Sequence, residues 1–311
     1  MIRKMKEADI EALRILDKLC FKTKTLRRIE LMESFINENA SLVYEHDGKI
    51  IGYIFNHVLG NFGWFGTFGV HPDYRSSHIG KRLINETINI FHNEFKVKNI
   101  GLVTMPDSAY NIGFYMNLGF KPERLSLRLC KDVNKDIFTE DESLKNFKIK
   151  FVDMKNEIEY KNIMTIAKEI SENIYSGMDM SPELYQIEKN NMGTGFIVYE
   201  DKKPVGFGVL RNKNVFEVED TYAHIKLLCL NSEVLSYKKA VDAVLCKTYE
   251  YAVSNGLSEI FIDINTFDYD LCSHLIKEHC FKIDRSSLTL IMGDLDFYSN
   301  MNGIVMFRTA T

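Results

Sequence analysis

The spacing of apolar positions along the chain predicts helices and strands in regular alternation. From Ile79 onward, apolar side chains such as Leu83 and Phe91 recur every three or four residues, which predicts an amphipathic helix. Shorter apolar runs, such as the one at 64–70, predict strands. The alternation of the two patterns over the whole chain predicts a mixed α/β fold.

The first half of the chain predicts a full set of such elements. A helical stretch follows a short N-terminal strand, and Asp47-Gly48 is a hairpin signal between two further strands. Residues 123–130 alternate apolar and polar side chains, which predicts a closing strand. The expected strands include 1–6, 64–70, 99–105 and 123–130, and the expected helices are 7–20, 25–38, 79–95 and 109–117.

A polar and acidic segment at 131–146 is the best candidate for a linker. The chain has 311 residues, which exceeds one average domain and fits two of about 150 residues each. We therefore expect domains at 1–140 and 147–311. The second domain is expected to contain strands near 147, 195–200, 205–211, 223–230, 258–264, 281–292 and 303–309, and helices at 156–173, beyond 182, at 236–255 and at 268–278.

An internal repeat supports this division. The sequences LVYE at 42–45 and IGY at 51–53 reappear as IVYE at 197–200 and VGF at 205–207. Each half then continues with a strand, a long helix, another strand and a short helix. We therefore expect the same scaffold twice.

The stretch FGTFGVHPDYRSSHIGKR at 65–82 is the most informative for chemistry. An apolar strand pattern stops at His71-Pro72, and a polar turn then opens a helix. The first turn of a helix has backbone N–H groups without internal partners and carries the positive end of the helix dipole. Small residues there allow a phosphate to approach, and Lys81 and Arg82 add positive charge. The stretch therefore predicts a cradle for a diphosphate.

This stretch resembles the acyl-CoA-binding motif of the GNAT N-acyltransferase superfamily, Q/R-x-x-G-x-G/A. Arg75 takes the first motif position and Gly80 the last, whereas His78 stands where the family has its first glycine. Residues 70–74 resemble the V-x-P-x-Y that often precedes the motif, and residues 115–120 resemble the family's Y-x-x-x-G-F. The order and spacing of these motifs are more specific than any one of them alone.

The resemblance covers nearly the whole chain and implies two tandem GNAT-like domains, each a mixed, mostly antiparallel sheet flanked by helices. It also implies an N-acetyltransferase that uses acetyl-CoA as co-substrate. A primary amine would attack the thioester directly, without a covalent enzyme intermediate, so that positioning dominates the catalysis. The alternative is a non-catalytic acyl-CoA-binding module that senses or regulates.

The resemblance further implies where the cofactor binds. The family separates two strands at the segment equivalent to 68–70, and the pantetheine arm then pairs with free backbone groups as an additional strand. Ser108 and Asn111 could bind the pantetheine arm or could cap the helix that follows them. The expected cofactor-binding residues are Phe68, Gly69, Val70, Arg75, Ser76, Ser77, His78, Ile79, Gly80, Lys81, Ser108 and Asn111.

By the same resemblance, Tyr115 is the expected general acid that protonates the leaving thiolate. The reaction also requires a base, because a primary amine with a pKa of about 10.4 is almost fully protonated at neutral pH. Many family members use a glutamate on the strand equivalent to 64–69, but this strand carries no acid. Asp107, at the end of the next strand, is the best placed alternative. Three other residues remain candidates for the general base: Glu45, His57 and His71.

The second half departs from these motifs. The turn equivalent to the first-half motif is 235–240, where Leu235 replaces the arginine and Lys238 replaces the first glycine. Ile276 stands at the position of the motif tyrosine. We therefore expect this half to have lost acyl-CoA binding and either to support the fold or to shape the acceptor pocket.

Four residues near the predicted helix 268–278 have side chains of the kind that bind metals: Cys272, His274, His279 and Cys280. Cys272 and His279 are spaced to share a face, whereas His274 is expected to point elsewhere. We therefore expect a helix end with a packed cysteine and no metal ion.

Composition excludes several classes of protein. The net charge is −4 without a concentrated basic stripe, which argues against nucleic-acid binding. No window approaches 18 uninterrupted apolar residues and the N-terminal stretch is charged, so we expect neither a membrane span nor a signal peptide. The six cysteines lack C-x-x-C spacing, which favours reduced thiols and a cytoplasmic location. The expected partner is a small-molecule or peptide amine.

Overall fold

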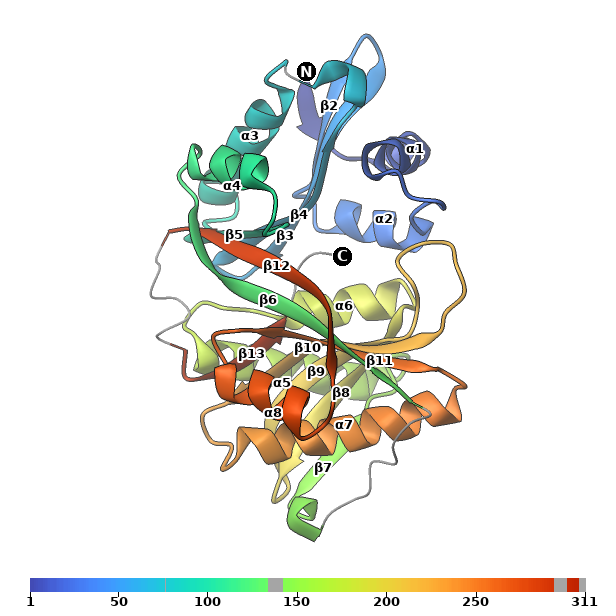
Figure 1. Cartoon of the computed structure of the whole chain (residues 1–311), viewed down its shortest axis with the longest axis vertical. Helices are drawn as coiled ribbons and strands as arrows, with labels where there is room; N and C mark the ends of the chain where they lie inside the picture. Colours follow the sequence, from blue (N-terminus) through green and yellow to red (C-terminus); the bar gives the residue numbers. More distant parts are fainter. Residues whose placement is uncertain (76, 134–141, 294–300, 308–311) are drawn as a thin grey trace.

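The computed structural model describes residues 1–75, 77–133, 142–293 and 301–307. Its strands form one 13-stranded sheet with helices on both faces (Figure 1). The strands are β1 (Ile2–Lys4), β2 (Leu42–His46), β3 (Lys49–Leu59), β4 (Phe62–Val70), β5 (Asn99–Thr104), β6 (Lys121–Asp132), β7 (Phe147–Phe151), β8 (Gly193–Glu200), β9 (Lys203–Arg211), β10 (Tyr222–Asn231), β11 (Glu259–Asn265), β12 (Lys282–Met292) and β13 (Gly303–Phe307). The helices are α1 (Ile10–Phe21), α2 (Ile29–Asn37), α3 (Ile79–Asn93), α4 (Ala109–Met116), α5 (Glu157–Ile174), α6 (Ser181–Lys189), α7 (Tyr237–Ser254) and α8 (Tyr269–Lys277), with the short 3-10 helices η1 (Glu7–Asp9), η2 (Pro72–Tyr74) and η3 (Glu142–Leu144).

The strand order shows how the two halves are joined. The order is β1-β2-β3-β4-β5-β12-β6-β11-β10-β9-β8-β7, and β13 lies alongside β10. β12, near the end of the chain, lies between β5 and β6. β6, from the first half, lies between β12 and β11. Each half therefore inserts its closing strand into the sheet of the other half.

The two halves otherwise repeat one arrangement. β4 pairs in parallel with β5, and β10 pairs in parallel with β11, whereas the remaining neighbours in the sheet are antiparallel. The expected fold class, a mixed and mostly antiparallel sheet flanked by helices, is confirmed. The domain limits at residues 140 and 147 stay a prediction, because the exchanged strands belong to both parts of the sheet.

Helices cover both faces of the sheet in each half. α1 and α2 pack on one face of the first half, and α3 and α4 pack on the other (Figure 1). In the second half, α5 and α6 contribute to one core and α7 and α8 to another. The core under α5 and α6 also includes Leu59, Phe62 and Trp64 from the first half. The two halves therefore share a hydrophobic core as well as a sheet.

A buried polar network crosses the exchanged strands. Arg128 on β6 donates to one carboxylate oxygen of Asp263 on β11 (3.1 Å), and His224 on β10 lies 2.7 Å from the other oxygen. Burial lowers the pKa of His224 to about 3, although Asp263 opposes this shift. The ring is therefore neutral, donates through Nε2 to Asp263 and accepts through Nδ1 from Arg211 (3.2 Å). Such a network stabilises the fold only when all its members are present, because removal of one member leaves a buried charge without its partner.

Most of the elements expected from the sequence are confirmed, with small differences in their limits. β6 continues to Asp132, into the segment expected to be a linker, because its end pairs with Glu259 on β11. β13 ends at Phe307, and the rest of the expected strand 303–309 lies outside the described residues. In the part of the chain that the structure describes, no helix is long and apolar enough to cross a membrane.

Replacing Leu290 on β12 by alanine should lower the free energy of unfolding by about 2–5 kcal/mol. Leu290 is fully buried and packs in the core of the first half, although it belongs to the second half of the sequence. Unfolding in denaturant, followed by circular dichroism and by the fluorescence of Trp64, measures the change.

The matched control is Ile283→Ala on the same strand. Ile283 is 55% exposed, so this change should alter the free energy of unfolding by less than about 0.5 kcal/mol. Because the halves share strands and a core, both probes should report one transition. Two separate transitions would contradict the shared core.

Candidate active site

An opening in the sheet lies between β4 and β5. The two strands pair only at residues 62–64 of β4, although β4 continues to Val70 and β5 to Thr104. A register shift between Ile54 and Asn56 on β3 marks a bulge at the same level. Among the described residues, no strand pairs with the edge of β4 that faces β5 beyond this point. The backbone groups on this edge can therefore receive an extended ligand.

The expected phosphate-binding turn follows the end of β4. His71 caps η2 through Nδ1, and the chain then enters α3 at His78, whose backbone is left-handed (φ 59°, ψ 10°). This conformation costs a residue other than glycine about 1–2 kcal/mol. The hydroxyl of Ser77 donates to the carbonyl of Tyr74, and the side chains of Ser77 and His78 are exposed. Ser76 lies outside the described residues.

A close contact between α3 and β4 fixes the position of this turn. A Cβ atom on Gly80 would lie 2.9 Å from Cζ of Phe68, so only glycine lets the helix approach without a shift of that ring. Phe68, Gly69 and Val70 are the last residues of β4. Ile79 is buried beneath the turn and therefore anchors the helix. The helix N-terminus thus lies against the open part of β4.

Two cations belong to the same turn. Nε of Arg75 lies 3.4 Å from the carbonyl of Val70, and its Nη2 lies 3.5 Å from the carbonyl of Cys20 at the end of α1. Both distances are long for hydrogen bonds, and the side chain is exposed, so Arg75 can turn toward an anion. Lys81 is also exposed. The turn therefore combines helix N–H groups with positive side chains.

Ser108 and Asn111 lie at the start of α4. The hydroxyl of Ser108 caps the helix by accepting the backbone N–H of Asn111 (3.3 Å). This bond is the capping role that the sequence left open as the alternative to cofactor binding. The contact of either side chain with a cofactor stays a prediction.

Tyr115 on α4 borders the opening. Its ring packs against Phe65, Phe114 and Phe120, with centroids 6.0, 5.4 and 6.2 Å away. Phe65 belongs to the part of β4 that has separated from β5. Burial raises the pKa of Tyr115 well above its usual value, which keeps the hydroxyl protonated but makes it a weaker acid than a solvated phenol. A role as proton donor therefore rests on the position of the ring beside Phe65 and not on this shift.

The candidates for the general base lie in different surroundings. Asp107 is exposed in the loop between β5 and α4. Glu45 forms an ion pair with Arg3 (2.9 Å), and Nδ1 of His57 lies 2.9 Å from a carboxylate oxygen of Glu38. Burial alone would lower the pKa of His57, but Glu38 raises it above its usual value. Glu45 and His57 are therefore engaged in ion pairs, whereas Asp107 faces solvent.

A buried polar cluster behind β4 was not anticipated from the sequence. Asp17 on α1 pairs with Arg27 (3.2 Å) and accepts the hydroxyl of Tyr53 (2.6 Å). Arg27 also reaches Thr67, in the separated part of β4 (3.4 Å). The sequence did contain one indication of this cluster. Asp17 lies four residues after Leu13, which places its carboxylate on the apolar face of the first helix.

The second half contributes a wall to this region. The backbone N–H of Arg28 donates to the carbonyl of Val215 (3.0 Å), and the N–H of Glu217 donates to the carbonyl of Leu26 (3.0 Å). The loop between β9 and β10 therefore docks on the connection between α1 and α2, and Figure 1 shows it extending toward α2. The side of the opening next to α1 and α2 is thus built from both halves.

The equivalent opening in the second half is filled by the chain itself. β10 pairs with β11 only at residues 222–225, although it continues to Asn231. From Leu227 to Leu230, β9 pairs with one edge of β10, and β13 pairs with the other edge from Leu227 to Asn231. β13 therefore occupies the place that corresponds to the open edge of β4. The altered turn at 235–240 lies next to this filled opening.

Two hollows lie elsewhere on the surface. One of about 580 Å³ and one of about 330 Å³ lie at the junction of the halves, and neither is lined by an expected cofactor-binding residue. We place the site by backbone geometry rather than by the size of a hollow, because an extended ligand that adds to a strand edge needs unpaired backbone groups more than an enclosed volume.

Comparison with known proteins identifies this arrangement. Residues 10–120 match the model of the acetyltransferase (GNAT) family. An uncharacterized N-acetyltransferase from Methanocaldococcus jannaschii is 24% identical over 135 residues, which are 42% of this chain and 85% of that protein.

Two solved structures share the fold over both halves. A putative acetyltransferase from Pyrococcus horikoshii has a TM-score of 0.68 at 18% identity and covers 98% of this chain and 93% of its own. A tandem GNAT protein from the clavulanic acid biosynthesis pathway has a TM-score of 0.62 at 11% identity, over 94% of this chain and 98% of its own. The matched family region contains the opening, the turn that is expected to bind phosphate, and Tyr115. Residues 10–120 therefore match the acetyltransferase (GNAT) family, and over both halves the chain has the fold of these solved structures.

Proposed function

We propose that the first half binds acetyl-CoA in the opening between β4 and β5 and transfers the acetyl group to a primary amine. The observation that carries this proposal is the edge of β4 beyond Trp64, with which no strand pairs among the described residues and which leads directly to the N-terminus of α3. The pantetheine arm would pair with this edge, and the diphosphate would meet the N–H groups in the first turn of α3. Arg75 and Lys81 would supply positive charge.

Direct attack of the amine on the thioester would need one group that accepts a proton and one that donates a proton. We assign the donor role to Tyr115, because its phenol is protonated and borders the opening. We assign the base to Asp107, which is exposed near the end of β5 and can accept a proton through water. The remaining contribution would come from holding the amine close to the thioester carbon.

The acceptor amine would approach from the side of α1 and α2. Asp17, Arg27 and Thr67 connect that side to the opening, and the loop between β9 and β10 adds a wall from the second half. We therefore propose that the second half shapes the acceptor pocket and binds no cofactor of its own. A small-molecule or peptide amine is the expected acceptor.

Calorimetric titration with acetyl-CoA should give about one binding site per chain, because β13 fills the second opening. Ser77→Asp should weaken binding by about tenfold or more, since a new negative charge would stand at the N-terminus of α3, where the diphosphate is expected.

The matched control is Ser236→Asp. Ser236 caps α7, the counterpart of α3, and aspartate is also a good cap, so this change should leave the affinity unaltered. Two equivalent sites per chain, or equal losses in both variants, would show that the second half binds the cofactor too.

Tyr115→Phe should lower kcat by about tenfold or more and leave the Kd for acetyl-CoA within about twofold, because the ring still packs and only the proton donor is lost. Release of coenzyme A with a panel of amines measures the rate. A coupled assay is preferable to a thiol reagent, since Cys280 is exposed. An unchanged kcat would mean that water supplies the proton. Binding without turnover for every amine tested would favour the sensor alternative.

His78→Gly should keep or tighten acetyl-CoA binding, because glycine adopts the left-handed backbone of this position without strain. If the imidazole instead donates to a phosphate, the variant would lose a charge-assisted hydrogen bond worth about 1.5–3 kcal/mol. Dissociation constants of both proteins at pH 6 and pH 8 separate the cases. A large loss that is greater at pH 6 would make His78 a cofactor ligand.

A further inference from the structure

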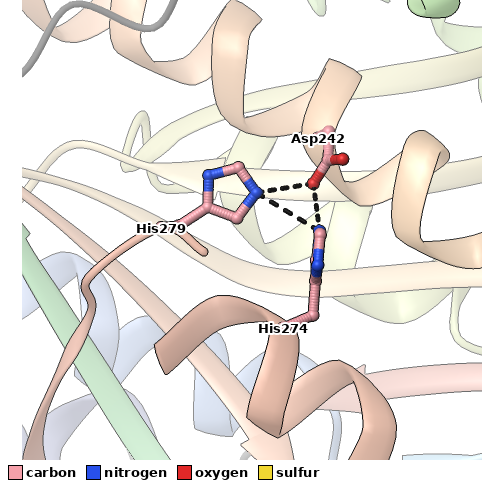
Figure 2. Close-up of side chains that lie close together, drawn as sticks. All are labelled: Asp242, His274 and His279. Atoms are coloured by element: carbon pink, nitrogen blue, oxygen red, sulfur yellow. Dashed lines mark hydrogen bonds and ion pairs between the residues drawn. The ribbon is translucent and has the colours of Figure 1, made fainter. Parts of the chain in front are cut away.

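Two histidines and one aspartate converge in the second half, far from the first opening along the chain. Asp242 belongs to α7, His274 to α8 and His279 to the turn after α8. Nε2 of His274 and Nε2 of His279 lie 2.6 and 2.7 Å from the same oxygen of Asp242, and 3.3 Å from each other. Figure 2 shows both rings pointing with this nitrogen toward the carboxylate. Three potential ligand atoms thus meet at one point.

The end of α8 brings the two histidines together. Cys280 has a left-handed backbone (φ 55°), and the N–H of Phe281 bonds to the carbonyl of Leu275 (3.1 Å). This turn folds the chain back over the last turn of the helix, so that His279 returns beside His274. The sequence pattern led us to expect that His274 points elsewhere, because helical spacing alone ignores the turn that ends the helix.

We propose that Asp242, His274 and His279 bind one divalent transition-metal ion, with zinc as the preferred ion, and that the ion ties α7 to α8. Within the residues that the structure describes, this is the one group of three such side chains whose ligand atoms meet. The proposal does not depend on the acetyl transfer proposed above. It replaces the expectation from the sequence that this segment binds no metal.

The ligand set and its spacing suit zinc. Imidazole nitrogens and carboxylate oxygens bind Zn²⁺ at about 2.0–2.2 Å in tetrahedral geometry, which separates two nitrogens by about 3.3 Å. The two Nε2 atoms already have this separation. The oxygen of Asp242, now 2.6 and 2.7 Å from these nitrogens, would move outward by about 0.8 Å to reach the tetrahedral separation. A water molecule would complete four-coordination, because the three side chains are 13–21% exposed.

A simple hydrogen-bonded group is the competing explanation. In that case, both imidazoles would donate to one oxygen of Asp242, and their two N–H groups would face each other at 3.3 Å. A divalent cation removes this conflict, because each nitrogen then offers a lone pair to the same centre. The experiment must therefore separate metal binding from hydrogen bonding.

The neighbouring cysteines do not take part. The thiol of Cys272 donates to the carbonyl of Asn265 (3.5 Å), and Cys280 is exposed. The first half offers no copy of the site either. The turns at 75–80 and 235–240 correspond with an offset of 160 residues, so Arg82 is the counterpart of Asp242. Its guanidinium contacts the hydroxyl of Tyr44 (2.7 Å), and the first half therefore has a cation where the second half has a carboxylate. The proposed site is therefore a feature of the second half alone.

The test uses the full chain, stripped of metal by a chelator and dialysed. Titration with ZnCl₂ should give about one ion per chain by calorimetry and by elemental analysis. Excess Zn²⁺, at about 100 times the Kd, should raise the Tm by roughly 3–8 °C, because the ion binds the folded chain.

His274→Gln is the informative variant, since glutamine can still donate a hydrogen bond to Asp242 but is a poor zinc ligand. It should lower the zinc affinity by more than the roughly 10–100-fold that loss of an outer-shell partner costs. His279→Gln should do the same, so that one variant suffices if the other fails to fold. The control is His46→Gln, because His46 lies beside Asp47 (3.5 Å) without a second histidine.

Each outcome decides the question. Binding of one ion that is lost in the His274 or His279 variant and kept in the His46 variant supports the site. Absence of stoichiometric binding, together with an unchanged Tm in Zn²⁺, would leave only the hydrogen-bonded group and overturn the proposal. Equal zinc affinity in all variants would place the ion at other residues and overturn it too.

Discussion

The exchange of β6 and β12 is the constraint on which the rest of the structure depends. A strand makes backbone hydrogen bonds on both edges only when two neighbours are present, and here each half provides the missing neighbour for the other. β12 closes the first half beside β5, and β6 closes the second half beside β11. Each half therefore completes the sheet of the other, and the two halves share one continuous sheet.

The exchange also fixes the position of the two openings. In both halves, a parallel pair of strands separates after three or four residues, which is a property of the repeated scaffold. In the part of the chain that the structure describes, no strand covers the edge of β4 beyond Trp64, whereas β13 covers the equivalent edge of β10. The same scaffold therefore gives one opening that can receive an extended ligand and one that holds a segment of its own chain.

Buried polar contacts make the junction between the halves specific. Gln186 on α6 donates to Glu38 (3.0 Å) and to the carbonyl of Ser34 (3.3 Å) of the first half. Within the second half, a buried ion pair of Glu183 with Lys226 ties α6 to β10 (2.6 Å). Hydrophobic burial is not directional and would allow the two surfaces to shift against each other. The hydrogen bonds and the ion pair are directional, so they stabilise the junction fully in one arrangement only. α6 of the second half is thereby held in a fixed place against the first half.

The sequence by itself determined the local features of this protein. Its periodicity gave the strands and helices, and the motif at 65–82 with Tyr115 located the candidate site, because both depend on residues that are close in the chain. The exchange of strands, the filling of the second opening by β13 and the meeting of Asp242 with two histidines joined residues that are distant in sequence. Only the tertiary structure decided these features. The alternation of side chains along a strand shows which face of that strand is buried, but it does not show which other strand will pair with it.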